Sequence, residues 1–271
     1  DELHGDLSRA TYPRDRNPKN TTPADPCKLD HIYHTNVTSG GDKEYPCGNG
    51  RGKRFSDTQG AECHWKRIRD SKNDDEIGAC APLRRLSLCD KNLEHIELEN
   101  ITTHNLLADV CLAAKYEGES LKNYHAQYQA TYGDVGSTIC TVLARSFADL
   151  GDIVRGKDLY LGDKKEKLKL EKKLKLFFEK IHGKLPKEAK DHYEDKGKNY
   201  YKLREDWWAL NREKVWSAIT CNAHDSHYTK MLADGSIKQS DRKKCRNITG
   251  VPTYFDYVPQ YLRWFEEWAE D

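Results

Sequence analysis

The sequence lacks any unbroken run of about 18 uncharged apolar residues, the minimum length of a membrane-spanning helix. We therefore expect no part of it to cross a membrane. It also lacks an initiating methionine and the apolar core of a signal peptide, which indicates an internal fragment of a longer protein. On this interpretation, any membrane anchor lies outside these 271 residues.

Motifs that mark common active sites are missing as well. The chain contains no G-x-S-x-G nucleophile turn, no H-E-x-x-H zinc motif and no G-x-x-x-x-G-K-[ST] phosphate loop. His224 and His227 have only Asp225 and Cys221 nearby as further metal ligands, so we interpret them as exposed loop residues. We expect no catalytic residue, no metal and no cofactor, and we do not expect an enzyme.

Close C-x-x-C pairs are absent, which argues against a zinc ribbon or a thioredoxin-like redox site. The nine cysteines are instead widely spaced, which is typical of disulfides in an oxidising, extracellular environment. Because nine is odd, one cysteine is expected to stay free or to pair outside this sequence. The nine cysteines are Cys27, Cys47, Cys63, Cys80, Cys89, Cys111, Cys140, Cys221 and Cys245.

Spacing and compartment predict at least three disulfides. We favour a Cys111–Cys140 bond, because both residues lie on predicted helices joined by a loop, and a Cys221–Cys245 bond, because these residues flank a polar excursion. Five cysteines lie in the first third of the chain, where apolar periodicity is weakest. Disulfides are therefore expected to hold that region together.

Apolar residues recur at three- and four-residue steps in the rest of the chain, which predicts an all-α helical bundle with little sheet. The first expected helix covers residues 104–116, and Gly118 is expected to end it. In the last helix Tyr261, Phe265 and Trp268 share a face, which we interpret as facing the core. The expected helices are residues 104–116, 137–155, 164–182, 200–220 and 259–270.

The chain is expected to divide into three regions. Residues 1–26 contain four prolines and no periodic apolar pattern, so they are predicted to form an extended or poorly ordered arm. Residues 27–100 are predicted to form a loop-rich subdomain stapled by disulfides, and residues 101–271 a helical-bundle subdomain.

Lysine is concentrated in one segment, although the whole chain carries a formal charge of only +1. Residues 163–190 contain eleven lysines against five acidic residues. Placing the apolar stripe of this helix inward turns Lys164, Lys165, Lys172 and Lys175 outward. These lysines form either a solvated face or a surface that binds polyanions.

Basic clusters in the cysteine-rich region have the same two interpretations. A guanidinium suits bidentate contacts with sulfate or carboxylate, and a disulfide-braced loop lowers the ordering cost of binding. Nucleic acid is a poor candidate ligand because the chain is nearly neutral and has no DNA- or RNA-binding motif. The clusters comprise Arg51, Lys53, Arg54, Lys66, Arg67, Arg69, Arg84 and Arg85.

Five long strings combine helical periodicity with an unusual choice of side chains. They are ACAPLRRLSLCDKNLE (79–94), AKYEGESL (114–121), LARSFADLGDIVRGKDLYLG (143–162), NYYKLREDWWALNREKVWSAI (199–219) and DYVPQYLRWFEEW (256–268). Together they resemble the Duffy-binding-like alpha domain of the variant erythrocyte membrane proteins of Plasmodium falciparum. The strings follow the order that this family uses, and the resemblance extends over most of the chain from about Cys27 to Asp271.

The resemblance implies the Duffy-binding-like fold, with residues 1–26 as the tail of an amino-terminal segment and with a later subdomain not included here. It implies a role in cell adhesion. The chain would belong to the extracellular portion of a membrane protein that is exported to the surface of the infected red cell. The sequence of that protein would vary antigenically. The implied partners are a host erythrocyte receptor in rosetting, heparin or heparan sulfate, blood-group sugars and complement receptor.

A second hypothesis gives the domain a structural task. It would orient a neighbouring, receptor-binding cysteine-rich domain while its own surface varies to evade antibodies. A glycan-binding domain should depend strongly on salt and on lysine or arginine clusters, whereas a domain that binds a protein should rely on an exposed apolar anchor.

Overall fold

A computed structural model describes residues 2–12, 21–37, 45–48, 62–69, 78–99, 101–132, 138–162 and 166–270. Within these residues the protein is mostly helical, as expected. The α-helices are α1 (Leu83–Leu86), α2 (Lys91–His95), α3 (Thr103–Tyr132), α4 (Ile139–Arg155), α5 (Glu166–Lys184), α6 (Lys187–His192), α7 (Tyr201–Ile219) and α8 (Gln260–Glu270). The other elements are the 3-10 helices η1 (Leu7–Arg9), η2 (Pro26–Lys28) and η3 (Phe255–Tyr257) and the antiparallel strands β1 (Thr229–Met231) and β2 (Ile237–Gln239).

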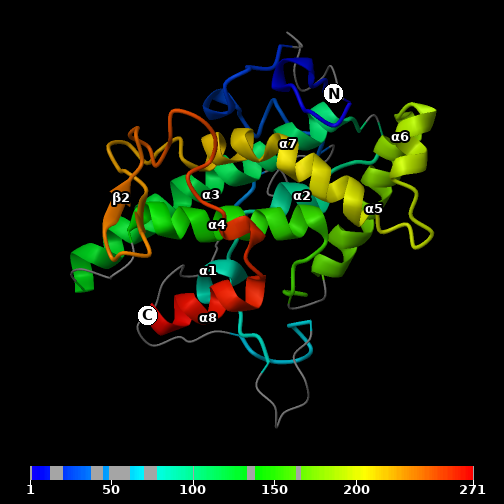
Figure 1. Ribbon diagram of the computed structural model, residues 1–271. Helices are drawn as coiled ribbons and strands as arrows, with labels where there is room; N and C mark the ends of the chain where they lie inside the picture. Colours follow the sequence, from blue (N-terminus) through cyan, green and yellow to red (C-terminus); the bar gives the residue numbers. More distant parts are fainter. Residues whose placement is uncertain are drawn as a thin grey trace.

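The long helices α3, α4 and α7 pack against one another and form the centre of the molecule (Figure 1). Aromatic side chains fill the space between them. The ring of Phe147 in α4 lies 5.1 Å from the rings of both Trp208 and Trp216 in α7. The buried indole N–H of Trp208 donates to Asp256 at 2.8 Å. Burying this polar group therefore carries no free-energy penalty for an unpaired donor.

Four of the five expected helices are confirmed to within about two residues at each end. Helix α4 shows why its bounds could be predicted. The side chain of Thr138 accepts a hydrogen bond from the backbone N–H of Thr141 and caps the start of the helix. Gly156 ends it with a φ of 77°, a left-handed conformation that glycine adopts without steric cost.

Helix α3 is longer than expected, because Gly118 does not end it. A Cβ atom on Gly118 would lie 1.9 Å from the carbonyl oxygen of Ile219 at the end of α7. The glycine therefore allows α3 and α7 to approach closely, and the helix continues to Tyr132. Prediction of a helix end at this glycine was wrong, because the close approach of another helix is not visible in the local sequence.

Helix α8 buries a different face from the one expected. Tyr261, Phe265 and Trp268 are 53%, 73% and 40% exposed, so their interpretation as core residues was wrong. The side chains that α8 turns inward include Arg263 and Glu267, which are buried. Charged partners in α1 and α4 make this burial favourable, as described below.

The amino-terminal residues 2–12 lie on the helical core. Leu3 and Leu7 are buried in the main hydrophobic cluster. The side chain of Asn211 in α7 holds this segment, because it accepts from the backbone N–H of Gly5 at 2.6 Å and donates to the carbonyl of Leu3 at 2.8 Å. An extended, poorly ordered arm is therefore wrong for these residues.

Four disulfides form among the nine cysteines, which confirms the expected minimum of three. Both favoured pairings were wrong. Cys111 is buried in the core and forms no disulfide, since α3 turns it inward away from the start of α4. The other two expected partners bond elsewhere. The pairs are Cys27–Cys221, Cys47–Cys89, Cys63–Cys80 and Cys140–Cys245.

Candidate functional site

Two arginines expected on a glycan-binding surface are buried instead. Arg84 donates from its Nε and one terminal nitrogen to both oxygens of Glu267, at 2.9 and 2.8 Å. Its terminal nitrogen also lies 2.8 Å from Asp149. Arg85 makes the same kind of forked contact with both oxygens of Asp158. Because both guanidiniums are buried and paired with carboxylates of the protein, neither arginine is available to a ligand, and their assignment as glycan-binding residues was wrong.

Asp149 lies at the centre of this buried network between α1, α4 and α8. Burial alone would raise its pKa, but Arg84 and Arg263 outweigh burial and hold the pKa well below its ordinary value. Asp152, one turn further along α4, behaves differently. Burial raises its pKa to about 6 although Arg263 and Arg155 favour the charged form. The network fastens α8 to the bundle and offers no surface to a partner.

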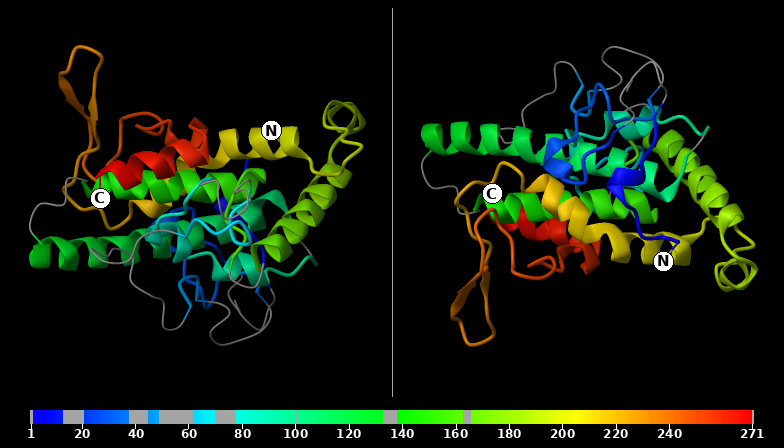
Figure 2. Two further views of the ribbon diagram at one scale, coloured as in Figure 1. Left: turned by 90° about the horizontal axis from the view of Figure 1, so that it is seen from below. Right: turned by 90° about the horizontal axis from the view of Figure 1, so that it is seen from above.

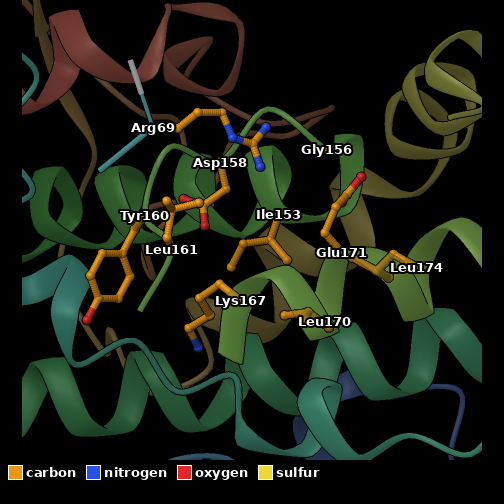
Figure 3. A pocket seen from close by; sticks show the side chains of 10 residues that line it. All are labelled: Arg69, Ile153, Gly156, Asp158, Tyr160, Leu161, Lys167, Leu170, Glu171 and Leu174. Carbon is orange, nitrogen blue, oxygen red and sulfur yellow. The ribbon is translucent and has the colours of Figure 1, made fainter. Parts of the chain in front are cut away.

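A small hollow lies between the end of α4 and the start of α5 (Figure 3). Its volume of about 20 Å³ has room for one water molecule and not for a sugar. Lys167 on its wall lies 2.6 Å from Asp90, and Glu171 accepts from both terminal nitrogens of Arg204 at 2.8 Å. Arg69 extends across one side of the hollow (Figure 3). We interpret the hollow as a small gap between packed elements and not as a ligand site.

Three lysines of α5 bind the end of α2 and the chain that follows it as far as α3. Each donates from its ammonium group to backbone carbonyl oxygens, which supplies donors to an irregular segment. The bonds run from Lys173 to Glu94 (2.8 Å) and Ile96 (3.3 Å), from Lys180 to Leu98 (2.6 Å) and from Lys184 to Ile101 (3.0 Å). Part of the positive charge of residues 163–190 therefore has a structural role that sequence periodicity did not indicate.

Lys172 and Lys175 lie on the other side of α5. Lys172 is exposed and makes no hydrogen bond or ion pair with a residue that the structure describes. Lys175 is half-buried and interacts electrostatically with Asp195. The other two lysines proposed for this face, Lys164 and Lys165, lie outside the described residues.

The basic residues before α1 also differ in whether an acidic residue pairs with them. Lys66 is exposed, and its ammonium lies 5.3 Å from the centre of the Trp65 ring, a cation–π contact. Arg67 pairs with Glu62 at 2.7 Å, which leaves less of its charge for a ligand. The cluster Arg51, Lys53 and Arg54 lies outside the described residues.

The histidines considered as metal ligands have other neighbours. His224 contacts the ammonium of Lys122, and the ring of His227 lies 2.8 Å from the carbonyl oxygen of Ser240. Across the described ranges, no group of three or more histidine, cysteine or acidic residues is arranged to hold a metal.

Exposed aromatic side chains that the sequence did not indicate lie on α8 and at η3. Phe265 is 73% and Tyr254 is 71% exposed. Tyr257, Tyr261 and Trp268 are also exposed. Aromatic side chains of this kind are typical of the centres of protein–protein interfaces. The described residues thus provide two kinds of candidate surface, exposed lysines and exposed aromatic rings.

The chain matches the family model described as the Duffy binding domain over residues 78–263. No curated protein matches it. It is 42% identical to the NTS-DBL1-alpha and CIDR-gamma double domain of PfEMP1 from the Plasmodium falciparum varO strain, with a TM-score of 0.86, and the match covers 99% of this chain and 39% of that one.

Two further solved structures support the same relationship. The NTS-DBL1(alpha-1) domain of PfEMP1 from the same strain is 41% identical, with a TM-score of 0.77 and coverage of 99% of this chain and 55% of that one. The DBLb domain of a PfEMP1 protein bound to human ICAM-1 is 30% identical, with a TM-score of 0.73 and coverage of 99% and 56%. The chain thus spans well under two thirds of these relatives. It belongs to the Duffy binding domain family, and its expected similarity to the Duffy-binding-like alpha domains of Plasmodium falciparum is confirmed.

Proposed function

We propose that this chain is an adhesion module of a variant surface antigen, placed outside the infected red cell, where it binds receptors on host red cells. A relative that is 30% identical is bound to human ICAM-1, so receptor binding is one use of this fold. No helix in the described part of the chain is long and apolar enough to cross a membrane. The ligand class we favour is a sulfated glycosaminoglycan such as heparan sulfate, with blood-group sugars as the next candidates.

The exposed charge on α5 carries this proposal. Lys172 has no carboxylate partner among the described residues, and Lys175 lies one turn further along the helix. Each exposed charge contact contributes at most about 1 kcal/mol, so useful affinity requires several cations that act together on a repeating anion. A sulfated polysaccharide supplies such a repeat.

Heparin retention with two matched variants tests the proposal. We expect Lys172→Glu with Lys175→Glu to weaken retention roughly tenfold, and Lys28→Glu with Lys187→Glu, which changes the net charge equally at two other exposed positions, to weaken it much less. Raising salt from about 0.05 to about 0.5 M should release the protein, because screening shortens the reach of surface charges. Soluble heparin should block binding to red cells. Retention that ignores salt and both pairs of substitutions would contradict the proposal.

The scaffold hypothesis is our second candidate, and the exposed aromatic side chains of α8 favour it. An exposed phenylalanine is costly to leave in water and is suited to burial against a neighbouring domain. If the cysteine-rich domain packs there, Phe265→Ser should weaken its association with this chain in calorimetry. Leu176→Ser, at an exposed apolar residue of α5, should not. Equal effects of the two substitutions would contradict the scaffold hypothesis.

A further inference from the structure

The hairpin of β1 and β2 projects from the body of the molecule at the end opposite to α5 and α6 in both views of Figure 2. Its turn is well defined. The N–H of Gly235, which has a φ of 80°, donates to the carbonyl of Leu232 at 2.9 Å. Asp234 accepts from the backbone and the hydroxyl of Ser236, at 2.9 and 2.6 Å. This turn fixes the register of the strands.

The base of the hairpin is also anchored. Cys245 is bonded to Cys140 at the start of α4. The backbone N–H of Cys245 donates to Ser226 at 2.7 Å, and its carbonyl accepts from the indole of Trp216 at 3.0 Å. Lys244 and Cys245 both have positive φ, at 60° and 53°, a conformation that surrounding contacts must maintain. The hairpin is therefore a braced projection, so little ordering cost accompanies binding to it.

Like charges face each other on this hairpin. Lys230 is paired directly with Lys238 in the strand register, and both are exposed. At the base, Arg242 and Arg246 form an isolated antiparallel bridge. Like charges directly opposite each other destabilise a sheet. Residues 229–246 contain six lysines and arginines against two aspartates.

No carboxylate of the described residues forms an ion pair with either lysine of this pair. Asp234 is hydrogen-bonded to Ser236, and Asp225 pairs with Lys243 at 2.7 Å. Neither Lys230 nor Lys238 makes a hydrogen bond or an ion pair with any residue in the described ranges. Two exposed lysines thus occupy directly opposed strand positions, and neither pairs with an anionic side chain of the described residues.

We propose that the hairpin is a second, separate binding surface for a sulfated polysaccharide, which it contacts through Lys230 and Lys238. An anion between two opposed ammonium groups removes their mutual repulsion, so the unfavourable pair becomes favourable when the ligand is bound. A sulfated polysaccharide provides closely spaced anions, and a lysine ammonium serves as a point charge that tolerates different sulfate positions. The inference rests on the proposed glycan binding and adds a second site for the same ligand class.

The opposite face of the hairpin points to a different partner and provides a control. Met231 is paired with Ile237, and these side chains are 75% and 69% exposed. Alternation along the strands places them on the other side from the lysines. A protein partner would use this apolar face, whereas a polysaccharide would use the lysine face.

Lysine footprinting tests the inference directly. The chain is acetylated with and without saturating heparin, and modification of each lysine is measured by mass spectrometry. We expect heparin to protect Lys230 and Lys238 and to leave Lys28 and Lys187 reactive, and we expect chemically desulfated heparin to protect none of them. Protection of Lys172 with Lys230 and Lys238 still reactive would overturn the inference and leave the proposed function standing. No heparin-dependent protection at any lysine would overturn the proposed function itself.

Substitutions separate the two faces of the hairpin. Lys230→Glu with Lys238→Glu should weaken heparin binding roughly tenfold and make it less sensitive to salt. Met231→Thr with Ile237→Thr keeps β-forming side chains and all charges, so heparin affinity should be unchanged. Loss of binding in the threonine variant, with normal affinity in the glutamate variant, would overturn the inference in favour of an apolar partner.

Discussion

Arg84 fills a buried position where its guanidinium meets Glu267 and Asp149, so it contributes to stability rather than to recognition. The same is true of Arg263, whose terminal nitrogen lies 2.8 Å from Asp149. Each charge in this network depends on the others, since none of them can be solvated by bulk water. Breaking one ion pair therefore leaves a buried charge without compensation.

We expect Arg84→Ala to lower the free energy of unfolding by about 3–5 kcal/mol, because Glu267 would be left buried without its partner and Asp149 would keep only Arg263 as an ion-pair partner among the described residues. Denaturant unfolding measures this loss. The matched control is Lys66→Ala, at an exposed cation, which should change the free energy by less than about 0.5 kcal/mol. Similar values for the two variants would contradict the structural role of Arg84.

Asp109 of α3 is expected to titrate near neutral pH. Burial raises its pKa from 3.8 to about 6, although Thr35 and Asn36 donate hydrogen bonds to it. Because the folded pKa lies above the unfolded one, the folded protein binds this proton more readily. The Asp109 contribution to the free energy of unfolding should therefore rise by about 1 kcal/mol as pH falls from about 7 to about 5. Carboxyl-carbon NMR measures the titration directly, and a midpoint below about 4 would contradict it.

At the scale of the element, the distance between two packed helices depends on the residues at which their backbones approach each other. Gly118 and Gly183 both lie within helices, yet only Gly118 is close to another backbone. At Gly183 no atom lies within 4 Å of the position that a Cβ would occupy. Comparing the same substitution at the two glycines therefore separates the effect of helix propensity on stability from the effect of helix–helix packing.

We expect Gly118→Ala to destabilise the protein by several times the helix-propensity gain of about 1 kcal/mol, because the added Cβ would overlap the carbonyl of Ile219 and push α3 from α7. Gly183→Ala should instead be neutral or stabilising by up to about 1 kcal/mol. Thermal unfolding of the two variants measures the difference. Equal midpoints would show that α3 and α7 do not approach as closely as the structure shows.

At the scale of the whole molecule, disulfides tie distant parts of the chain to the bundle. Cys27–Cys221 joins the amino-terminal region to the end of α7 across 194 residues, whereas Cys63–Cys80 closes a loop of 17. In the chain-entropy account, a longer closed loop restricts the unfolded chain more strongly. The two bonds should therefore differ in their effect on stability.

We expect Cys27→Ser with Cys221→Ser to lower the free energy of unfolding by roughly 5 kcal/mol, and Cys63→Ser with Cys80→Ser to lower it by roughly 3 kcal/mol. Denaturant unfolding of the two double variants gives the order. A larger loss for the Cys63–Cys80 variant would show that local contacts, rather than loop length, determine what these bonds contribute.

The sequence by itself determined the features that depend on local order along the chain. Periodic apolar residues located α4, α5 and α7, because such a stripe can be buried only when the segment is helical. The same periodicity located α8, although the face that it marked is exposed. Long strings in a fixed order identified the family, and the number and spacing of cysteines predicted disulfides. None of these features requires knowledge of what lies next to a segment in space.

Only the tertiary structure decided which groups meet. Cys140 pairs with Cys245, and Cys111 stays in the core, because the packing of the helices sets which cysteines are adjacent. Arg84 is buried, while Phe265 is exposed, since carboxylates from α4 and α8 surround the first and nothing in the described residues covers the second. A local pattern specifies the hydrophobicity of a face, but the free energy of burying that face depends on the partners that the fold brings to it.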